Sequence, residues 1–595
     1  MSFKAIWSGS WRERFRNPHF WFMVAVVAFV TVALVILRKM EHPWEGMTGK
    51  RIRDDRPWVE VDFGRFFGFW FGLGATILIA LIGLSSGWWW KLAYPAGASR
   101  PVDRERFSRG AKVVLALILV FAGWVRGQHL DRFILRDEQD TLRYHLHGYH
   151  QQDRETGEIQ FLATDWPDAA FGNRHGNNPV LMTVLSRASL EAWWKLTGAP
   201  RDRYSAVAIR LPGYLAGLAS ILVMAWCVAG FAPVRVALIA AAVAAIHSLH
   251  VDYSIQARGY AYVLLGTPLA FGGAIRALNG GRWRHWACLV GGSAISLYGY
   301  LGSLFFVGPF ALAVFGVLFV RWRGLNGDLR SIADWKRDVT RLLVTGLIGV
   351  SIYLTFAVPP LMSFWVNRED FPGSIHMEWT WWMALWTDFA GGRIFKLPAN
   401  GAGVIAPWPE VFREVVLSEP LVWLGMLAVV PVVVVGFREM WKHPRREVRW
   451  LFIVALLTPF VQTAVHRWVS HMVLFAFYLI YWLIPLIALF ALGLDRLLTK
   501  TTDAIAGRKP SVSQAKIRAG LTGVSFLLLY WTAGVGSNPY LAIARPPETK
   551  PTVHLRSVFN WISYPDGRIL KLDNVLPVPD TFPESLPPPP PLPKD

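Results

Sequence analysis

Two adjacent carboxylates, Asp137 and Glu138, stand in a short polar run that follows an apolar stretch ending near residue 130. A carboxylate at a membrane surface can act as a general base toward a hydroxyl group, provided that neighbouring charges tune its pKa. The adjacent Arg136 favours the ionised form of Asp137. The pair therefore predicts either an acid–base site beside a membrane or a solvated acidic loop.

His175, Asn177 and Asn178 form a second polar group, directly before Pro179 and another apolar stretch. Asparagine side chains both donate and accept hydrogen bonds, which suits a ligand with many hydroxyl groups. The same residues also fit the start of a helix, with Asn178 as the N-cap and Pro179 at the first helical position. Both interpretations stay open at this point.

Two arginines lie in short connections between apolar stretches. Arg258 belongs to a connection that also holds Asp252 and Tyr260, and Arg467 follows His466 in another. The planar guanidinium group binds phosphate through two parallel hydrogen bonds, whereas its alternative role is to reach the lipid headgroups. If both connections open on the same membrane face as the acidic pair, the combination suits an anionic, lipid-linked substrate.

The elements that must position these residues are membrane helices. Of 595 residues, 53% are hydrophobic and only 17% are charged, whereas soluble proteins carry about 25% charged residues. Apolar runs of about 18 residues or more recur along the chain. The sequence predicts an all-α polytopic membrane protein with thirteen spans, near residues 20–37, 66–90, 111–130, 208–230, 234–250, 259–277, 286–302, 304–320, 341–361, 419–437, 450–465, 472–493 and 519–535.

Basic residues set the predicted orientation. With the N-terminus in the cytoplasm, loops such as 91–110, 321–340 and 438–449 become cytoplasmic, and they are rich in Lys and Arg. Positively charged loops remain on the cytoplasmic side of a membrane. Most of the net charge of +20 is thereby explained without a nucleic-acid partner. The active site and the C-terminus are then extracytoplasmic, in a protein of the inner (plasma) membrane.

The apolar stretch Val180–Leu196 is not predicted to span the membrane. Arg187, Glu191 and Lys195 follow one another at intervals of four, so they share one face of a helix. We expect an outer juxtamembrane helix that lies in the interface plane with a polar stripe toward water. A span here would also move the later basic loops to the outside.

The chain divides into three predicted parts: two N-terminal spans in 1–110, a transmembrane core in 111–535, and a proline-rich outer tail in 536–595. The core carries two long outer loops, 131–207 and 364–418. Residues Pro587–Pro591 favour an extended polyproline rod, with a disordered end as the alternative.

Ion- and proton-coupled transporters need ionisable groups at mid-membrane. Asp and Glu are missing from the interior of the predicted spans, which weighs against transport. Arg126, near the end of the third span, must lie at the interface or inside the protein. Cys227 and Cys288 lie in apolar runs and fit small core residues. No cluster has the spacing of metal ligands, so a divalent metal is conceivable but unsupported.

The order of these motifs resembles the GT-C superfamily of multi-spanning glycosyltransferases, in particular the family 39, protein O-mannosyltransferase-like branch. The resemblance covers mainly residues 111–320. It rests on Asp137-Glu138, Asn177-Asn178-Pro179-Val180-Leu181, Arg210-Leu211-Pro212 and Ser254-Ile255-Gln256-Ala257-Arg258-Gly259-Tyr260. The chain has Val180 where the family usually has a second proline, which leaves the acceptor more open than the reaction.

The resemblance implies transfer of a sugar, with inversion, from a polyprenyl-phosphate donor to a hydroxyl of a glycan, lipid or protein. Asp137 would be the general base, with Glu138 as its orienting neighbour or as the alternative base. Arg258 and Tyr260 would bind the donor phosphate, with Arg467 and His466 as a second choice. The acceptor or sugar would contact His175, Asn177, Asn178 and Asp252. The competing interpretations are a transporter or lipid flippase, and a non-catalytic scaffold that presents the tail.

Overall fold

The computed structural model describes residues 15, 17–95, 107–131, 134, 136–152, 159–173, 178–325, 327–367, 379–390, 417, 420–470, 474–508, 513–530, 561–563 and 569–571. Within them, nine helices are long and apolar enough to cross a membrane. A tenth is added if α12 (Val234–Ile246) and α13 (Ser248–Ser254), which meet at a bend of 62°, form one broken span. The chain is a predominantly helical, multi-pass membrane protein, and the exact number of thirteen spans stays a prediction.

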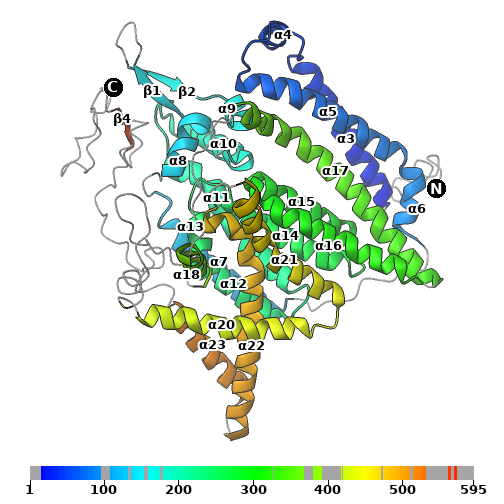
Figure 1. Cartoon of the computed structure of the whole chain (residues 1–595), viewed down its shortest axis with the longest axis vertical. Helices are drawn as coiled ribbons and strands as arrows, with labels where there is room; N and C mark the ends of the chain where they lie inside the picture. Colours follow the sequence, from blue (N-terminus) through cyan, green and yellow to red (C-terminus); the bar gives the residue numbers. More distant parts are fainter. Residues whose placement is uncertain are drawn as a thin grey trace.

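The N-terminal helices pack together along one flank of the molecule (Figure 1). They are α3 (Pro18–Lys39), α4 (Gly46–Arg53), α5 (Glu60–Leu84) and α6 (Ser86–Ala93), and α5 packs against both α3 and the long α17 (Leu329–Asn367). The predicted span 66–90 is placed too late, because α5 begins at Glu60 and ends at Leu84. Asp62 explains the early start: its carboxylate accepts hydrogen bonds from the Val59 N–H (2.9 Å) and from Arg51 (3.0 Å).

The centre of the bundle consists of α7 (Arg109–Gly127), α11 (Ala206–Val228), α12, α14 (Tyr260–Ala277) and α15 (Trp283–Gly299). Almost every residue of α14 is buried, and α14 and α15 form one of the closest pairs in the molecule. Both helices, like α23 (Gln514–Tyr530), match predicted spans but are not among the nine long apolar ones. Arg126 is fully buried, which confirms that it lies inside the protein.

The second half of the bundle holds the remaining membrane helices. They are α16 (Leu304–Arg323, preceded by η2, Leu301–Ser303), α20 (Pro420–Trp441), α21 (Arg446–Val465, followed by η4, His466–Ser470), and α22 (Leu483–Arg508, preceded by η5, Ala476–Trp482). The short α18 (Trp379–Ala390) packs beside α20 and η5. A Cβ at Gly436 would approach the Leu489 carbonyl to 1.8 Å, so this glycine allows the backbones of α20 and α22 to touch.

The loop predicted at 131–207 contains small elements at one end of the bundle. They are α8 (Arg136–Thr141), η1 (Leu142–Leu146), the antiparallel pair β1 (Gly148–Gln152) and β2 (Ile159–Ala163), α9 (Trp166–Phe171) and α10 (Val180–Thr197). A second antiparallel pair joins β3 (Trp561–Ser563) to β4 (Ile569–Lys571). The structure is consistent with the predicted all-α class, and its described residues add two short antiparallel strand pairs.

The helix predicted at Val180–Leu196 exists as α10, and it is not among the nine long apolar helices. The polar stripe that we expected on it is wrong, because Arg187 is buried and donates to the Leu146 carbonyl at 2.6 Å and to Thr164 at 3.2 Å. Arg187 also pairs with Glu191, which is partly exposed. The arginine points toward η1 and the end of β2 because the Leu146 carbonyl and the Thr164 hydroxyl accept its hydrogen bonds there.

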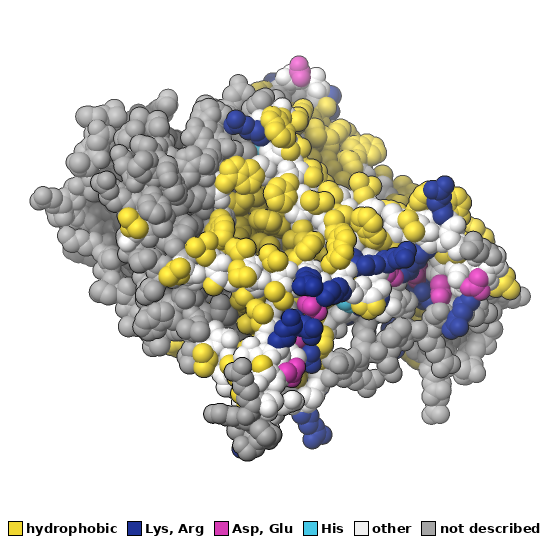
Figure 2. Space-filling view, turned by 60° about the horizontal axis from the view of Figure 1, so that its bottom comes forward, with side chains coloured by type: hydrophobic (Ala, Val, Ile, Leu, Met, Phe, Trp, Pro, Cys, Tyr) yellow, Lys and Arg dark blue, Asp and Glu magenta, His cyan; other side chains and the backbone are white. Residues whose placement is uncertain are grey.

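The connections between the membrane helices lie at the two ends of the bundle, and hydrogen bonds link those that share an end. At one end, Arg341 donates to Ala93 and Gly281, Arg321 to Leu278 and Glu447, Arg445 to Gly230, and Arg235 to Asp495. These contacts join the connections that were predicted to be cytoplasmic. Figure 2 shows basic side chains bordering a broad hydrophobic surface, as expected at the edge of a membrane-embedded belt. Which end faces the cytoplasm stays a prediction.

Candidate active site

A cavity of about 340 Å³ lies between the start of α14, the ends of α15 and α17, and the elements α8 and α10. Three of the residues singled out in the sequence, Asn178, Arg258 and Tyr260, line it. Thr141 of α8 and Asn173 add further polar groups. We refer to this cavity as the Arg258 pocket.

Arg258 lies half-buried between aromatic rings. Its guanidinium carbon is 4.8 Å from the ring centre of Tyr260, 4.9 Å from that of Phe477 and 5.9 Å from that of Tyr253. Aromatic faces attract a guanidinium group and restrict its rotamers. The cation is therefore pre-oriented, and the rings shield it partly from water, which strengthens its attraction for an anion.

The backbone that carries Arg258 is fixed by Glu138. One carboxylate oxygen accepts a hydrogen bond from the Ala257 N–H at 2.5 Å. Both oxygens also bind Arg210, at 2.9 Å and 2.7 Å, and both side chains of this ion pair are fully buried. Arg210 additionally donates to the Leu130 carbonyl. Glu138 thus connects α8, α11 and the segment just before Arg258.

Gly259, next to Arg258, permits the close approach of two neighbouring segments. A Cβ here would meet the Gly299 carbonyl oxygen at 1.8 Å and the Pro179 ring at 2.6 Å. The start of α14 therefore packs directly onto the end of α15 and onto the entry of α10. A larger residue at this position would have to push apart the walls of the Arg258 pocket.

Asn178 serves mainly as a structural link. Its side-chain N–H groups donate to the carbonyls of Ala169 (3.2 Å) and Gly172 (2.5 Å), and its oxygen accepts from Thr183. The helix start is therefore not as predicted, because the N-cap position of α10 belongs to Pro179 and Asn178 does not cap the helix. The amide instead satisfies carbonyls at the end of α9, where α10 packs.

The remaining predicted residues divide into two kinds. Asp137 belongs to α8, but its side chain lies outside the described part of the chain, and so do His175 and Asn177 entirely. Asp252 is buried in α13, His466 packs on the ring of Phe305, and Arg467 is exposed. None of these last three belongs to the described lining of the Arg258 pocket.

The other side of the pocket is apolar and aromatic. Leu301, Leu304 and Leu361 line it and are about half exposed, so the pocket continues to the surface of the membrane helices. Tyr300 stacks on Tyr478 with ring centres 5.0 Å apart, and both line the cavity. Sequence reasoning missed these tyrosines, since tyrosines near span ends fit an interfacial belt equally well.

The described residues contain no group of three or more His, Cys, Asp or Glu side chains that could hold a metal ion. Cys227 is a free, buried thiol, and Cys288 is a free, partly buried one. Within this part of the chain, Arg258 is the one charged side chain in the lining of the Arg258 pocket.

No protein-family model and no curated protein matches the sequence. Among solved structures, the chain superposes on the archaeal oligosaccharyltransferase AglB from Archaeoglobus fulgidus, in complex with an inhibitory peptide and a dolichol-phosphate, with a TM-score of 0.38. The sequence identity is 10%, and the match covers 74% of this chain and 57% of that one. A likeness at this level assigns neither a family nor an activity.

Proposed function

We propose that the protein is a membrane glycosyltransferase of the GT-C type, which moves a sugar from a polyprenyl-phosphate donor to a hydroxyl on the extracytoplasmic face with inversion. The observation that carries this proposal is the Arg258 pocket, in which a pre-oriented cation and hydroxyl-rich walls meet an apolar opening. A lipid-linked sugar phosphate requires this combination in one place.

Arg258 would bind the phosphate of the donor. When the glycosidic bond breaks, negative charge grows on the departing phosphate oxygen, and a fixed cation stabilises that charge more than it stabilises the ground state. The surrounding rings of Tyr253, Tyr260 and Phe477 support this role, because they hold the guanidinium group before the donor arrives. The exposed leucines of α16 and α17 would accept the first isoprene units.

Asp137 would remove the proton from the acceptor hydroxyl as its oxygen attacks the anomeric carbon. Support comes from the backbone of α8, where position 137 lies one helical turn before Thr141, which lines the pocket. Glu138 is engaged by Arg210 and by the Ala257 N–H, which favours a positioning role for it over a role as base.

The test uses the purified full-length protein in nanodiscs with a radiolabelled polyprenyl-phosphate sugar. We expect donor consumption that falls by well over tenfold in Arg258→Ala, with partial recovery in Arg258→Lys, which keeps the charge but loses the planar fork. Arg201→Ala is the matched control, since Arg201 is exposed and outside the described pocket lining. Undiminished consumption in Arg258→Ala, or movement of the intact donor across the bilayer without cleavage, would contradict the proposal.

A further inference from the structure

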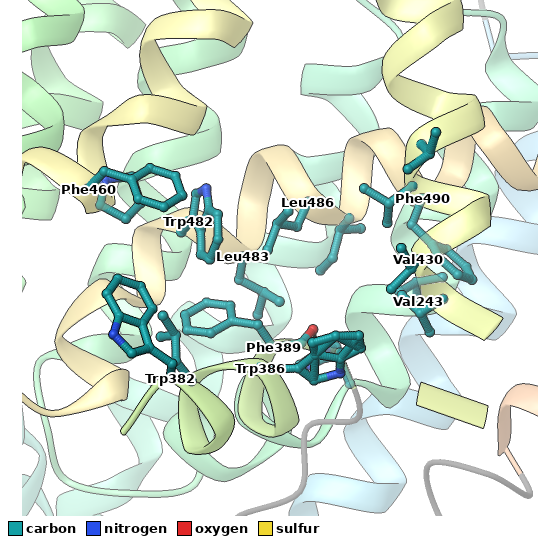
Figure 3. A pocket seen from close by; sticks show the side chains of 18 of the residues that line it. Val243, Trp382, Trp386, Phe389, Val430, Phe460, Trp482, Leu483, Leu486 and Phe490 are labelled. Carbon is teal, nitrogen blue, oxygen red and sulfur yellow. The ribbon is translucent and has the colours of Figure 1, made fainter. Parts of the chain in front are cut away.

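Two further cavities share no lining residue with the Arg258 pocket. One, of about 460 Å³, lies between α12, α18, α20, α21 and α22 (Figure 3), with Trp382 and Trp482 at one side and Val430 at the other. We refer to it as the tryptophan cavity. Its described lining contains no Asp, Glu, Lys or Arg, so it offers no charge by which a ligand is recognised.

The other cavity, of about 480 Å³, lies between α7, α12, α22 and α23 and carries charged groups. In this part of the bundle, α12 packs against α7 and α22, and α22 packs against α23 (Figure 1). Its described lining is apolar apart from Arg235, Asp495, Arg518 and Thr522. We refer to this cavity as the Asp495 groove.

Two guanidinium groups converge on one carboxylate oxygen in the Asp495 groove. The Nε atom of Arg235 donates to Oδ1 of Asp495 at 2.9 Å, and Nη2 of Arg518 donates to the same oxygen. Because both nitrogens lie within hydrogen-bond distance of one atom, a single phosphate group can reach both cations. The side chains of Arg235 and Arg518 are 54% and 29% exposed, and each guanidinium has five N–H donors.

The charges of the groove do not balance. Arg235 and Arg518 carry two positive charges, and Asp495 supplies the single negative charge in the described lining. A phosphate with one negative charge would neutralise the excess and accept further hydrogen bonds from the planar guanidinium groups. The walls therefore favour an anionic ligand over a neutral one.

The charged end of the groove lies at one end of the bundle. Arg235 is near the start of α12, and Arg126, near the end of α7, donates to Ala244 and Ala245 near the end of α12. The two helices therefore run in the same direction, and α7 also begins, at Arg109, on the charged side. This is the end that was predicted to be cytoplasmic. Along α12 the lining continues to the end of the helix, about 16 Å away at 1.5 Å per residue.

The apolar part of the groove opens toward the lipid. Val114 and Leu117 of α7 line it and are respectively about half and largely exposed. Both α7 and α22 are among the long apolar helices. A hydrocarbon chain that lies in the groove would therefore have its headgroup beside the two arginines, at the level where the membrane helices begin. Basic pockets between membrane helices on the cytoplasmic side bind anionic headgroups in this way.

We propose that the Asp495 groove binds an anionic phospholipid of the cytoplasmic leaflet. Its phosphate lies at Arg235 and Arg518, and one acyl chain lies along α7 and α12. A zwitterionic headgroup fits less well, because its own cation would add to the excess of positive charge. The proposal does not depend on the Arg258 pocket and stands whether or not the protein transfers sugars.

Photo-crosslinking of the full-length protein in phosphatidylcholine nanodiscs tests this assignment. Two lipid probes share one diazirine-bearing acyl chain and differ in the headgroup, phosphoglycerol in one and phosphocholine in the other. We expect the phosphatidylglycerol probe to label peptides from α7 or α12 about fivefold more, the effect of one basic residue near anionic lipid. Inorganic phosphate should compete no better than sodium chloride of the same ionic strength. Equal labelling by both probes, labelling confined to other helices, or specific competition by phosphate, which would indicate a site for a soluble anion, overturns the proposal.

Variants of Arg235 separate the charge from the packing of the groove. Arg235→Gln removes the excess charge and leaves Arg518 paired with Asp495, so the preference for phosphatidylglycerol should disappear, whereas Arg235→Lys should retain most of it. Arg496→Gln is the matched control, because Arg496 follows Asp495 on α22, pairs with Glu439 and is absent from the described lining. Size-exclusion chromatography and thermal unfolding check that each variant is folded, and the comparison of the two probes on the unmodified protein needs no variant. An unchanged preference in Arg235→Gln, or an equal loss in Arg496→Gln, also overturns the assignment.

Discussion

The Arg258 pocket and the tryptophan cavity are neighbours with opposite chemistry. The first joins a cation, amides and hydroxyls to an apolar opening. The second, the cavity of about 460 Å³ between α12, α18, α20, α21 and α22, is almost wholly apolar and has few polar side chains in its described lining, among them Thr463 and His247. The polar pocket is anchored by a buried ion pair that crosses between helices. The comparison shows that one helical bundle can hold a polar and an apolar cavity side by side, if the buried charges near the polar one are paired within the protein.

Asp137 offers the strongest test of the chemical difference between the two cavities. Asp137→Asn keeps the size of the side chain and removes the base, so sugar transfer should fall by roughly 10²–10⁴-fold. Donor binding should persist, because the phosphate contacts are assigned to Arg258. Transfer and donor binding are measured separately, with Asp140→Asn on the same helix as control. Transfer at the parent rate would remove Asp137 from the mechanism.

Replacement of Glu138 tests whether its buried ion pair with Arg210 stabilises the fold and the pocket. Glu138→Ala leaves the buried Arg210 without its partner and should destabilise the fold by about 3–5 kcal/mol, as measured for broken buried ion pairs. Thermal unfolding in detergent measures the loss. The double variant Glu138→Leu/Arg210→Met removes both charges and should recover much of the stability. It should not restore full transfer, since the Ala257 N–H then lacks its acceptor; full transfer would show that Arg258 needs no anchor.

Gly259 tests how tightly the walls of the Arg258 pocket are packed. Gly259→Ala should lower the affinity for the donor about tenfold or more, because the added methyl group meets the Gly299 carbonyl and Pro179 and overpacking displaces whole segments. The apparent donor KM measures the change. Gly291→Ala is the control, since a Cβ there meets no atom within 4 Å. Equal KM values in both variants would mean that the pocket does not depend on this contact.

The smallest expected effect is a change in donor consumption when a residue that lines only the second cavity is replaced. Trp482→Phe changes only the tryptophan cavity, so consumption of the donor should stay within about twofold, no more than the weaker end of one hydrogen bond. The same radiolabel assay measures it. A large loss would mean that the two cavities act as one site and that the contrast between them has no functional meaning.

Much of the helical architecture could be predicted from sequence, because apolar runs and basic loops are local signals. Arg258 could also be singled out from the sequence, because it is the only Lys or Arg in the short connection 251–258 between two apolar stretches. The ion pair of Glu138 and Arg210 was not, because its partners are 72 residues apart and each carries a local motif of its own. Arg187 was misjudged for a similar reason: its spacing with Glu191 fits an exposed stripe, and its buried oxygen partners come from other elements.

The tryptophan cavity escaped sequence reasoning altogether. Its lining comes from five separate helices, and tryptophan or valine in an apolar run indicates only burial or contact with lipid. A buried nitrogen without a hydrogen-bond partner, such as Nε1 of Trp386, can be recognised only when the positions of its neighbours are known. The α12–α13 bend after Ile246 was likewise unseen, because the apolar pattern runs on through His247 to residue 250.

The buried ion pair also has a consequence for how the protein is made. Glu138 precedes Arg210 along the chain, and the backbone group that completes its hydrogen bonds, at Ala257, comes 119 residues after it. A carboxylate without these partners is far more stable in water than inside the protein. We therefore expect α8 to pack onto the bundle only after α11 and the segment that contains Ala257 have been made. Formation of these hydrogen bonds would then join α8 and the membrane helices into one structural unit.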